Sequence, residues 1–593
     1  MVCVCEDLQH LPRMALKMVW LTLGVVRLLW CLTPQTGYIH PDEFFQSPEV
    51  MAGDILNLKT FRTWEFNTNY PSRSVLFPLV TSGFSFTVLK TLHNSNLFGS
   101  IVNSYSLLVV PRFFMTCLSF LIDYVIYRLS RLWGANPWNA LVLLSSSHVM
   151  LVFYTRTFSN VIEGALFALL LLLVAMDVKP ATVTQHHRAQ KKRNHKHLIG
   201  IVLISGFFNR PTFIGFALVP MLTWLSRDQG GKFRFNLKTI ILNSFGILSS
   251  MIATSFIFIL TDAVYYGLLL FNSDWALTDE NAIYKFIVKI SQHLVITPVN
   301  LIMYNLDPKS LVAHGSHPWF THLTVNSLML FGVLHFSAVV TSIQMVTGKF
   351  AHKAGSQKQQ WENKLAAQFP AVSPFTGYIV LVYFVPLFIL SVFSHQEARY
   401  ISPLIIPLVI LTAPKYELVR WKVVVVMFNV FGSVLFGCLH QGGLIPCLSY
   451  LEKTLHSNTP IVDQHKHNLV FYHTYMPPRY LLNIRKDQDS VRIIDLGGAE
   501  VSVLHKTVSE LLDDVSFKHI GSDQDMNIYI VAPGTVQEVV KNSGLSLQTI
   551  ASFFPHLSME DPPDLSSLLS KAGLDQLNLY IFEVHATPKN SEF

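Results

Sequence analysis

The sequence has few charged residues. Asp, Glu, Lys and Arg make up 14% of its 593 residues, whereas soluble domains carry about 25%. Hydrophobic residues make up 51% of the chain. Apolar runs of about 17 to 25 residues, long enough to cross roughly 30 Å of hydrocarbon, recur between residues 18 and 446. This composition excludes a soluble globular protein and predicts a polytopic membrane protein.

Cysteine is also scarce, and the common cofactor motifs are missing. The six cysteines are scattered, and no CxxC is paired with a second Cys or His cluster, so we predict no metal site. The sequence contains no GxxxxGK[ST] and no convincing GxGxxG. Its net charge of +7 is concentrated in a few loops. We therefore predict no nucleotide site and no nucleic-acid binding, and the sequence identifies no cofactor.

The composition changes near residue 448. Beyond this point, short runs typical of strands ("VRIID", "NIYIV", "LNLYIFEV") alternate with charged and Gly-, Pro- or Ser-containing stretches. The pattern predicts two domains: a transmembrane helical bundle over residues 1–448 and a small soluble α/β domain over residues 449–593.

Basic loops indicate the orientation. The stretches 178–197, 348–364 and 414–422 are rich in Lys and Arg, so we expect them in the cytosol. This topology requires that 138–153 does not fully cross and that 198–226 is a hairpin broken at "FNRPT", because Pro211 interrupts a helix. It places the soluble domain on the non-cytosolic side. No N-x-S/T sequon is present, so glycosylation provides no independent mark of sidedness.

Two adjacent acids follow the first apolar run. Asp42 and Glu43 lie in "HPDEFFQSPEV". One of them is a candidate general base that activates a hydroxyl, although two solvated loop acids would give the same pattern. The stretch "EFFQSPEVMAGDILN" has apolar and polar residues at helical spacing, which predicts an interfacial helix on the bilayer surface.

Two further polar groups are expected on the non-cytosolic side. In "YTRTFSNVIEG" the candidates are Arg156, Asn160 and Glu163; Asn160 and Glu163 can share a helix face, but Thr157 or Ser159 as an N-cap with Glu163 in the first turn is an equal alternative.

In "SHQEARY" the candidates are His395, Glu397 and Arg399. An Arg can bind a phosphate bidentately, and a Glu–Arg pair closing a short loop is the alternative. Arg27, inside the first apolar run, fits snorkelling as well as function.

Four ordered motifs carry a family resemblance. "HPDEFFQSPEV", "YTRTFSNVIEG", "FNRPT" and "HQEARYISPL" resemble glycosyltransferase family 22, endoplasmic-reticulum mannosyltransferases of the GT-C class that use dolichyl-phosphate mannose. The resemblance implies a membrane all-α GT-C bundle of about 9 to 12 segments, with catalytic loops and the C-terminal domain in the lumen. It also implies an inverting transfer, with Asp42 as base and Glu43 as its neighbour or alternate.

The resemblance also implies a substrate site. The candidates for donor-phosphate or substrate binding are polar residues of these motifs: His40, Arg156, Asn160, Glu163, Arg210, His395, Glu397 and Arg399. His395 and Arg399 are the main candidates for the phosphate, with Arg210 behind them. Related enzymes often read H-K-E-x-R-F, whereas this chain reads "HQEARY", so Gln396 replaces a possible cation. The resemblance does not decide whether a divalent metal is required.

The segment "YHTYMPPRYLL", residues 472–482, supplies His473 and Arg479 as acceptor candidates; a proline-rich turn that packs the soluble domain onto the bundle is the alternative. The motifs look most like those of family members that add a fourth, α-1,2-linked mannose to the third mannose of the GPI precursor glycolipid. Rivals are a sister activity on the third GPI mannose or the N-glycan lipid precursor and, outside enzymes, a lipid transporter or scramblase. Protein partners are not predicted.

Overall fold

The computed structural model describes residues 2–33, 35–95, 101–133, 135–178, 195–227, 236–267, 295–307, 315, 317–351, 374–415, 419–457, 466–518, 526–542, 545–567 and 570–585. The basic loops 178–197 and 348–364 lie largely outside these residues, and no membrane is present. The predicted orientation therefore stays a prediction.

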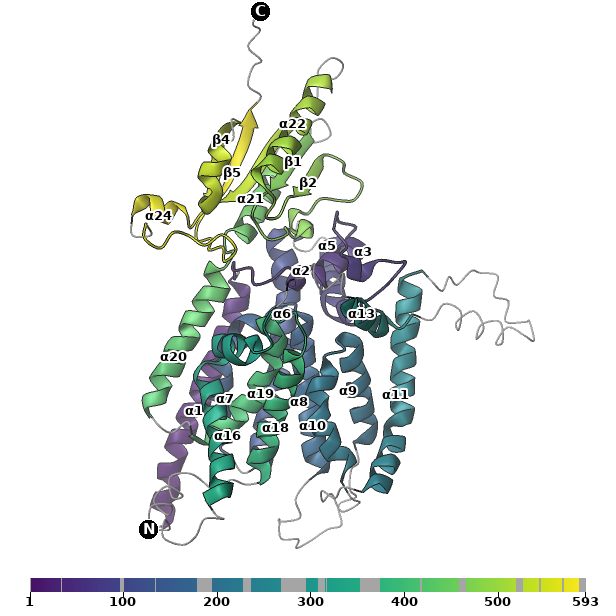
Figure 1. Cartoon of the computed structure of the whole chain (residues 1–593), viewed down its shortest axis with the longest axis vertical. Coiled ribbons are helices and arrows are strands. Elements are labelled where there is room, and N and C mark those ends of the chain that lie inside the picture. The colour runs from purple at the N-terminus through teal and green to yellow at the C-terminus, as the bar shows by residue number, and fades with distance from the viewer. Residues whose placement is uncertain are drawn as a thin grey trace, which may run out of the picture. The chain divides into compact units, whose positions relative to one another are not determined.

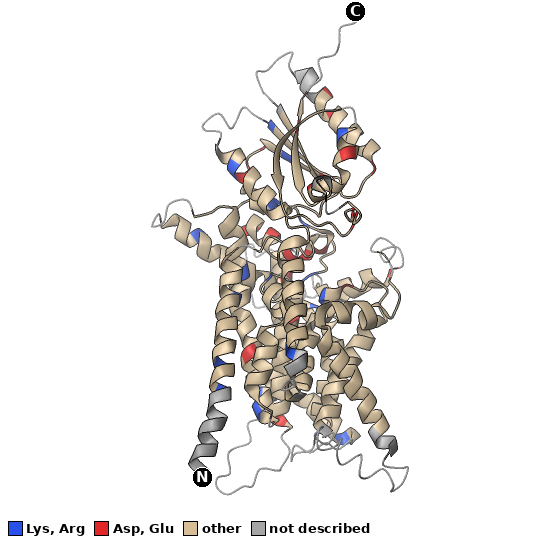
Figure 2. Cartoon of the chain, turned by 90° about the vertical axis from the view of Figure 1, so that its left-hand side faces the viewer, with Lys and Arg blue, Asp and Glu red and all other residues tan. Residues whose placement is uncertain are grey.

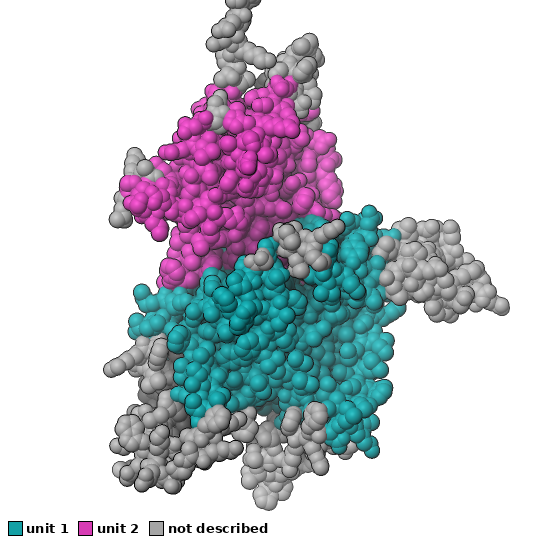
Figure 3. Space-filling model, in the orientation of Figure 1, with its two compact units in different colours: residues 1–28, 63–77, 115–429 teal, residues 29–62, 78–114, 430–593 magenta. Residues whose placement is uncertain are grey.

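The chain divides into two compact units (Figure 3). Unit 1 comprises residues 1–28, 63–77 and 115–429, and unit 2 comprises residues 29–62, 78–114 and 430–593. Unit 2 thus combines the loop that carries Asp42 with the C-terminal part of the chain. The sequence-based division at residues 448 and 449 is a different partition and stays a prediction.

Unit 1 is helical (Figure 1). Its elements are α1 (Val2–Leu32), η1 (Trp64–Phe66), α6 (Ser104–Leu132), α7 (Pro137–Ser145), η3 (Val149–Phe153), α8 (Ser159–Asp177), α9 (Lys196–Asn209), α10 (Phe213–Leu225), α11 (Leu237–Tyr265), α13 (Thr297–Leu306), η4 (His322–Asn326), α15 (Ser327–Phe331), α16 (Val333–Ala351), α18 (Pro374–Ser391), η5 (Ala398–Leu404), α19 (Ile405–Thr412), η6 (Ala413–Lys415) and α20 (Val419–Val434). Both α1 and α6 continue from one unit into the other, as does α20.

Helix breaks in unit 1 follow the sequence. The pair α9 and α10 is interrupted at residues 210–212, which confirms the broken hairpin at "FNRPT". Residues 138–153 form α7 and the separate short turn η3 rather than one continuous helix. In the fold, α9 packs between α8 and α11, and α10 packs on α8 and α18.

Among the described residues, five helices are long and apolar enough to cross a membrane: Arg13–Leu32, Ser104–Leu132, Ser159–Asp177, Leu237–Tyr265 and Lys422–Leu439; shorter apolar helices are also present. Figure 2 shows that charged residues are sparse along the unit 1 helices. Arg27 is fully buried and pairs with Asp123 at 2.7 Å. The pair removes an isolated charge from the apolar bundle, and the snorkelling interpretation is wrong because Arg27 does not reach solvent.

Unit 2 contains the remaining elements. They are α2 (Asp42–Phe45), α3 (Pro48–Ile55), α4 (Leu76–Pro78, which begins in unit 1), η2 (Leu79–Gly83), α5 (Phe84–Asn94), η7 (Leu435–Leu439), α21 (Leu444–Ser457), β1 (Lys466–Phe471), η8 (Arg479–Leu482), β2 (Val491–Asp495), α22 (Val501–Lys518), β3 (Met526–Pro533), η9 (Gly534–Val536), α23 (Gln537–Lys541), β4 (Ser546–Phe553), α24 (Lys571–Asp575) and β5 (Leu579–His585).

The C-terminal strands form one five-stranded sheet of order β2-β1-β3-β5-β4. β1 pairs in parallel with β2 (His467↔Val491) and with β3 (Lys466↔Met526). β5 pairs antiparallel with β3 and β4. Helix α22 contributes Leu504, Val508 and Leu511 to the buried core. Their spacing places them on one helical face, and the predicted α/β character of this region is confirmed.

Candidate active site

Asp42 begins the short helix α2. Pro41 directly precedes it, and proline is well suited to a helix start. The Asp42 side chain is 27% exposed and accepts a hydrogen bond from Gln46 Nε2. His40 Nδ1 lies 3.1 Å from the Asp42 backbone N–H, which donates to it, and 3.5 Å from Asp42 Oδ1. Asp42 is therefore an oriented carboxylate that solvent can still reach.

Glu43 has a different environment. Its side chain is fully buried, and its Oε1 lies 2.8 Å from Nε of Arg112 and 2.6 Å from Nη2. Arg112 Nη1 donates to the carbonyl of Gln35 at 2.9 Å. Burial requires this charge to be paired, so the solvated-loop interpretation is wrong for Glu43. The pairing favours a structural role for Glu43 and leaves Asp42 as the accessible acid.

The expected single interfacial helix is wrong. Residues 42–55 form α2 and α3, separated at Gln46–Ser47 because Pro48 starts a new helix. Both apolar and acidic positions are buried by protein, including Phe44, Val50 and Glu49. Most of the stretch is therefore packed against protein, and its exposed polar residues are Asp54 and Asn57.

Glu49 connects this loop with a distant part of unit 2. Its carboxylate accepts backbone N–H groups of Phe61 at 2.9 Å, Arg479 at 3.2 Å and Tyr480 at 3.3 Å. Burial raises the pKa of Glu49 to about 8, against the lowering effect of these donors. Tyr38 adds a second connection, donating to the carbonyl of Met476 at 2.8 Å. The loop that carries Asp42 is thus held by residues 476–480.

In unit 1, Glu163 is the centre of a buried polar group. Its Oε1 accepts from Thr212 Oγ1 at 2.7 Å, and its Oε2 accepts from Asn160 Nδ2 at 3.3 Å. Nε of Arg210 lies 3.6 Å from the same Oε2. The shared helix face of Asn160 and Glu163 is therefore confirmed. The capping alternative is wrong, because α8 begins at Ser159 with Phe158 as its N-cap and no acid in its first turn.

A second group is joined to the first through an aromatic ring. Glu397 accepts from His395 Nε2 at 2.6 Å and from Tyr400 Oη at 2.9 Å, and Arg399 Nε donates to its other oxygen. The Arg210 guanidinium lies 4.8 Å from the Tyr400 ring centroid, and that of Arg399 lies 5.1 Å from it. Cation–π contacts of this kind hold both cations beside one ring. The predicted Glu–Arg pair of the loop is confirmed.

The Gln396 side chain is held by hydrogen bonds to the protein backbone. It is buried; its Oε1 accepts from the backbone of His322, and its Nε2 donates to the carbonyls of Ser391 and Phe393. The amide thus closes the loop from inside. Arg156, before α8, is also fully buried.

The two acceptor candidates lie in unit 2. His473 Nδ1 lies 2.8 Å from Asp561 Oδ2, and the Arg479 guanidinium lies 4.9 Å from the centroid of the Phe61 ring. Both residues follow β1 in the chain, and the backbone N–H of Arg479 is one of the donors to Glu49. Within the described part of the chain, no group of three or more His, Cys, Asp or Glu side chains could hold a metal ion.

Three residues of these groups were missed from the sequence. Arg112 lies within an apolar helix 69 residues after Glu43, and the only signal was an Arg in an apolar run. Tyr400 sits beside Arg399 in the motif, but its role as a shared ring depends on Arg210. Glu49 reads as a first-turn acid of α3, and nothing local indicates its partners at residues 479 and 480.

The helical bundle and the small α/β domain match the architecture that the sequence predicted for a GT-C membrane glycosyltransferase. The chain belongs to the Alg9-like mannosyltransferase family, whose model matches residues 18–482, and it is a mannosyltransferase.

Among curated proteins, it is 43% identical over 573 residues to GPI alpha-1,2-mannosyltransferase 4 of Homo sapiens, covering 96% of this chain and 94% of that protein. It is 30% identical to GPI mannosyltransferase 4 of Drosophila melanogaster over 91% of this chain and 86% of that protein. The solved structure of ArnT from Cupriavidus metallidurans bound to undecaprenyl phosphate aligns with a TM-score of 0.47 at 13% identity, covering 95% of this chain and 97% of that one.

Proposed function

We propose that this protein transfers mannose from dolichyl-phosphate mannose to the third mannose of the GPI precursor glycolipid, forming an α-1,2 linkage on the lumenal side of the endoplasmic-reticulum membrane. The observation that carries the acceptor assignment is the 43% identity to the human GPI alpha-1,2-mannosyltransferase 4 over nearly the full length of both chains. A membrane-embedded enzyme suits this reaction, because both proposed substrates are lipids anchored in the same bilayer.

The proposed mechanism is a single in-line displacement. The acceptor hydroxyl oxygen attacks the anomeric carbon of mannose, the carbon–oxygen bond to phosphate breaks, and dolichyl phosphate leaves with the bonding electron pair. Asp42 takes the hydroxyl proton. This role is supported by its partial exposure and by the side chain of Gln46, which orients its carboxylate. The adjacent Glu43 is committed to Arg112, so it is the weaker candidate.

Arg399 and Arg210 of unit 1 are proposed to bind the donor phosphate. Arg399 and Arg210 lie against one Tyr400 ring, and each is also paired with a carboxylate, that of Glu397 and that of Glu163 respectively. Positive groups that are already in place stabilise the negative charge that develops on a departing phosphate. His395, held by Glu397, is the candidate donor of a further hydrogen bond. Arg156, Asn160 and His40 are proposed to complete substrate binding.

The first test is a transfer assay with purified protein. Labelled dolichyl-phosphate mannose is supplied with GPI precursors that carry no mannose, two mannoses or three mannoses. Product from the three-mannose lipid alone supports the proposed acceptor. Product from the two-mannose lipid would reassign the chain to the sister activity, and a folded protein that yields no product with any lipid would contradict the transfer function.

Asp42→Asn tests the base in the same assay. The substitution preserves size and removes the proton acceptor, so we expect turnover to fall about 10²- to 10⁴-fold. The elution profile in size-exclusion chromatography should match that of the wild type. Asp54→Asn is a matched control on the neighbouring helix α3, since Asp54 pairs with Arg62 at its surface. Normal turnover by Asp42→Asn would exclude Asp42 as the base.

A further inference from the structure

The C-terminal sheet has a pocket at a position that its topology favours for ligands. The pocket has a volume of about 560 Å³. It is lined by Tyr472 and His473, which follow β1, by Ser502 at the start of α22, and by Val536 and Val539 beyond β3. The strand order reverses between β1 and β3, where β2 lies on one side of β1 and β3 on the other. In open sheets with parallel strands, ligands bind outside the carboxyl ends of the strands at such a point.

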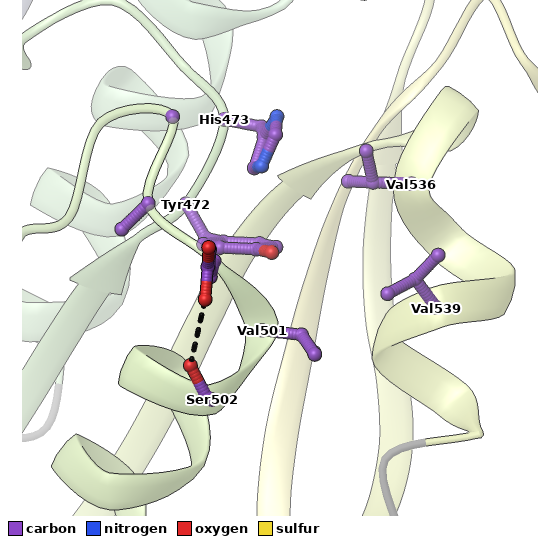
Figure 4. Close-up of a pocket in the computed structure, with 9 residues that line it drawn as sticks. Tyr472, His473, Val501, Ser502, Val536 and Val539 are labelled. Atoms are coloured by element: carbon purple, nitrogen blue, oxygen red, sulfur yellow. Dashed lines mark hydrogen bonds between the residues drawn. The ribbon is translucent and has the colours of Figure 1, made fainter.

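The backbone at this pocket leaves space for a ligand. Gly498 lines the pocket, and a Cβ added to it would meet no heavy atom within 4 Å. Figure 4 shows Tyr472 and His473 on one side of the pocket and Val536 and Val539 across from them. His473 is fixed by Asp561 at Nδ1, at 2.8 Å, and by a bond of the same length from its backbone N–H to the Gly497 carbonyl. The walls are therefore set before a ligand arrives.

The lining side chains disfavour an anionic ligand. Glu500 is among the lining residues, and the described residues of the lining include no Lys or Arg. The carboxylate of Asp561 is the partner of His473. A nucleotide or phosphate would meet negative charge at this site without a compensating side-chain cation, so its binding would be unfavourable. The location is that of a nucleotide pocket, but the side chains select a different class of ligand.

A neutral sugar has the complementary surface. Sugar hydroxyls donate hydrogen bonds to carboxylates such as Glu500, and a histidine with Nδ1–H bound to a carboxylate presents Nε2 as an acceptor. The C–H faces of a pyranose ring are apolar, as are the side chains of Val536 and Val539. Pockets of about 300 to 1,000 Å³ accommodate ligands larger than one monosaccharide.

From this arrangement we infer that the pocket binds a neutral oligosaccharide, the mannose chain of the lipid-linked acceptor. The inference rests on the proposed function for the identity of the glycan. It assigns the C-terminal domain a carbohydrate-binding site that is separate from the residues of the transfer reaction.

Binding is tested without transfer. Soluble α-linked mannotriose is added to the purified full-length protein in detergent micelles, and saturation-transfer NMR measures its contact with the protein. Ser502→Phe places a bulky ring at the pocket wall, and Val503→Phe makes the same change at a neighbouring position of α22 that is 43% exposed and outside the lining. We expect the mannotriose signal with the wild type and Val503→Phe and its loss with Ser502→Phe.

Glu500→Gln is the second variant, since it keeps the shape of the side chain and removes the charge that accepts sugar hydroxyls. We expect its mannotriose affinity to fall about tenfold, the loss that one charged hydrogen bond represents. Full mannotriose binding by both Ser502→Phe and Glu500→Gln would overturn the proposal. Displacement of mannotriose by millimolar inorganic phosphate would also overturn it, because it would identify an anion site.

Transfer kinetics separate this proposal from the proposed function. With the three-mannose lipid, Ser502→Phe should raise the acceptor KM about tenfold with kcat and the donor KM unchanged. An unchanged acceptor KM in an active enzyme would refute the pocket and leave the transferase assignment intact. Mannotriose binding that depends on Ser502, in a protein that transfers no mannose to any precursor, would refute the transferase assignment and support the pocket.

Discussion

Replacing Glu43 with glutamine would remove one charge from a buried ion pair and leave the other charge in place. Arg112 would keep its bond to the carbonyl of Gln35 at 2.9 Å, but the oxygen that lies 2.6 Å from Nη2 would become an uncharged amide oxygen. The Glu43 side chain is 0% exposed and that of Arg112 is 4% exposed, so water cannot replace the lost partner. Removing one member of such a pair costs about 3–5 kcal/mol.

The assay separates stability from chemistry. Denaturant titration of the purified protein in micelles should show Glu43→Gln unfolding at clearly lower denaturant than the wild type. The double variant Glu43→Gln with Arg112→Met removes both charges and should recover part of the loss, because no buried charge is then left unpaired. Turnover per folded Glu43→Gln molecule should stay within about tenfold of the wild type, far from the 10²- to 10⁴-fold loss that removal of a general base causes.

One result would refute this reasoning. If Glu43→Gln keeps wild-type stability and loses turnover to the extent expected of Asp42→Asn, then Glu43 is the group that takes the proton. The ion pair with Arg112 would in that case tune a reacting carboxylate instead of holding the loop.

Two further predictions concern the other groups. Arg399→Lys loses the planar fork that matches a phosphate, so the donor KM should rise about 10- to 100-fold. The control Arg485→Lys, at an exposed position, should leave the donor KM unchanged. Equal donor KM values for the two variants would contradict phosphate binding by Arg399. Burial raises the pKa of Glu49 to about 8 from the ordinary glutamate value of 4.5. Between these values the folded state holds a proton that the unfolded chain has lost, so stability should fall as pH rises, by at most about 1.4 kcal/mol per pH unit. Melting curves from pH 5 to 8 should therefore show a steeper decline for the wild type than for Glu49→Gln, and parallel declines would contradict the buried proton.

Sequence patterns predicted what depends on local chemistry. Pro211 ends α9, and the run of short strands beyond residue 465 forms the sheet. The Glu397–Arg399 pair and the shared face of Asn160 and Glu163 are also local, since their members lie two and three residues apart.

The partners of buried charges could not be predicted in this way. Glu43 and Arg112 are 69 residues apart, and the local sequence around either residue does not indicate that it pairs with the other. The helical spacing in residues 43–57 was misleading for the same reason. An acid at a polar position looks solvent-exposed in a helical pattern, whereas Glu49 is buried because distant backbone donors satisfy it. Periodicity reports which positions are polar, and tertiary contacts decide whether a polar position meets water.

The hydrogen bonds of Glu49 also determine when, during synthesis, the Asp42 loop can reach its final structure. Glu49 and its partner Arg479 are 430 residues apart, and the neighbouring residues Asn57 and Lys59 exchange backbone bonds with Lys486 and Ile484. At synthesis rates of about 5–20 residues per second, the Asp42 loop is made roughly 20–90 s before the chain that completes its hydrogen bonds. The Asp42 loop thus reaches its final form only after translation has passed Lys422–Leu439, the last of the described helices long and apolar enough to cross a membrane. A chain that stops after α21 would contain all of these helices and the proposed base, yet it would leave the carboxyl group of Glu49 without its donors from residues 479 and 480.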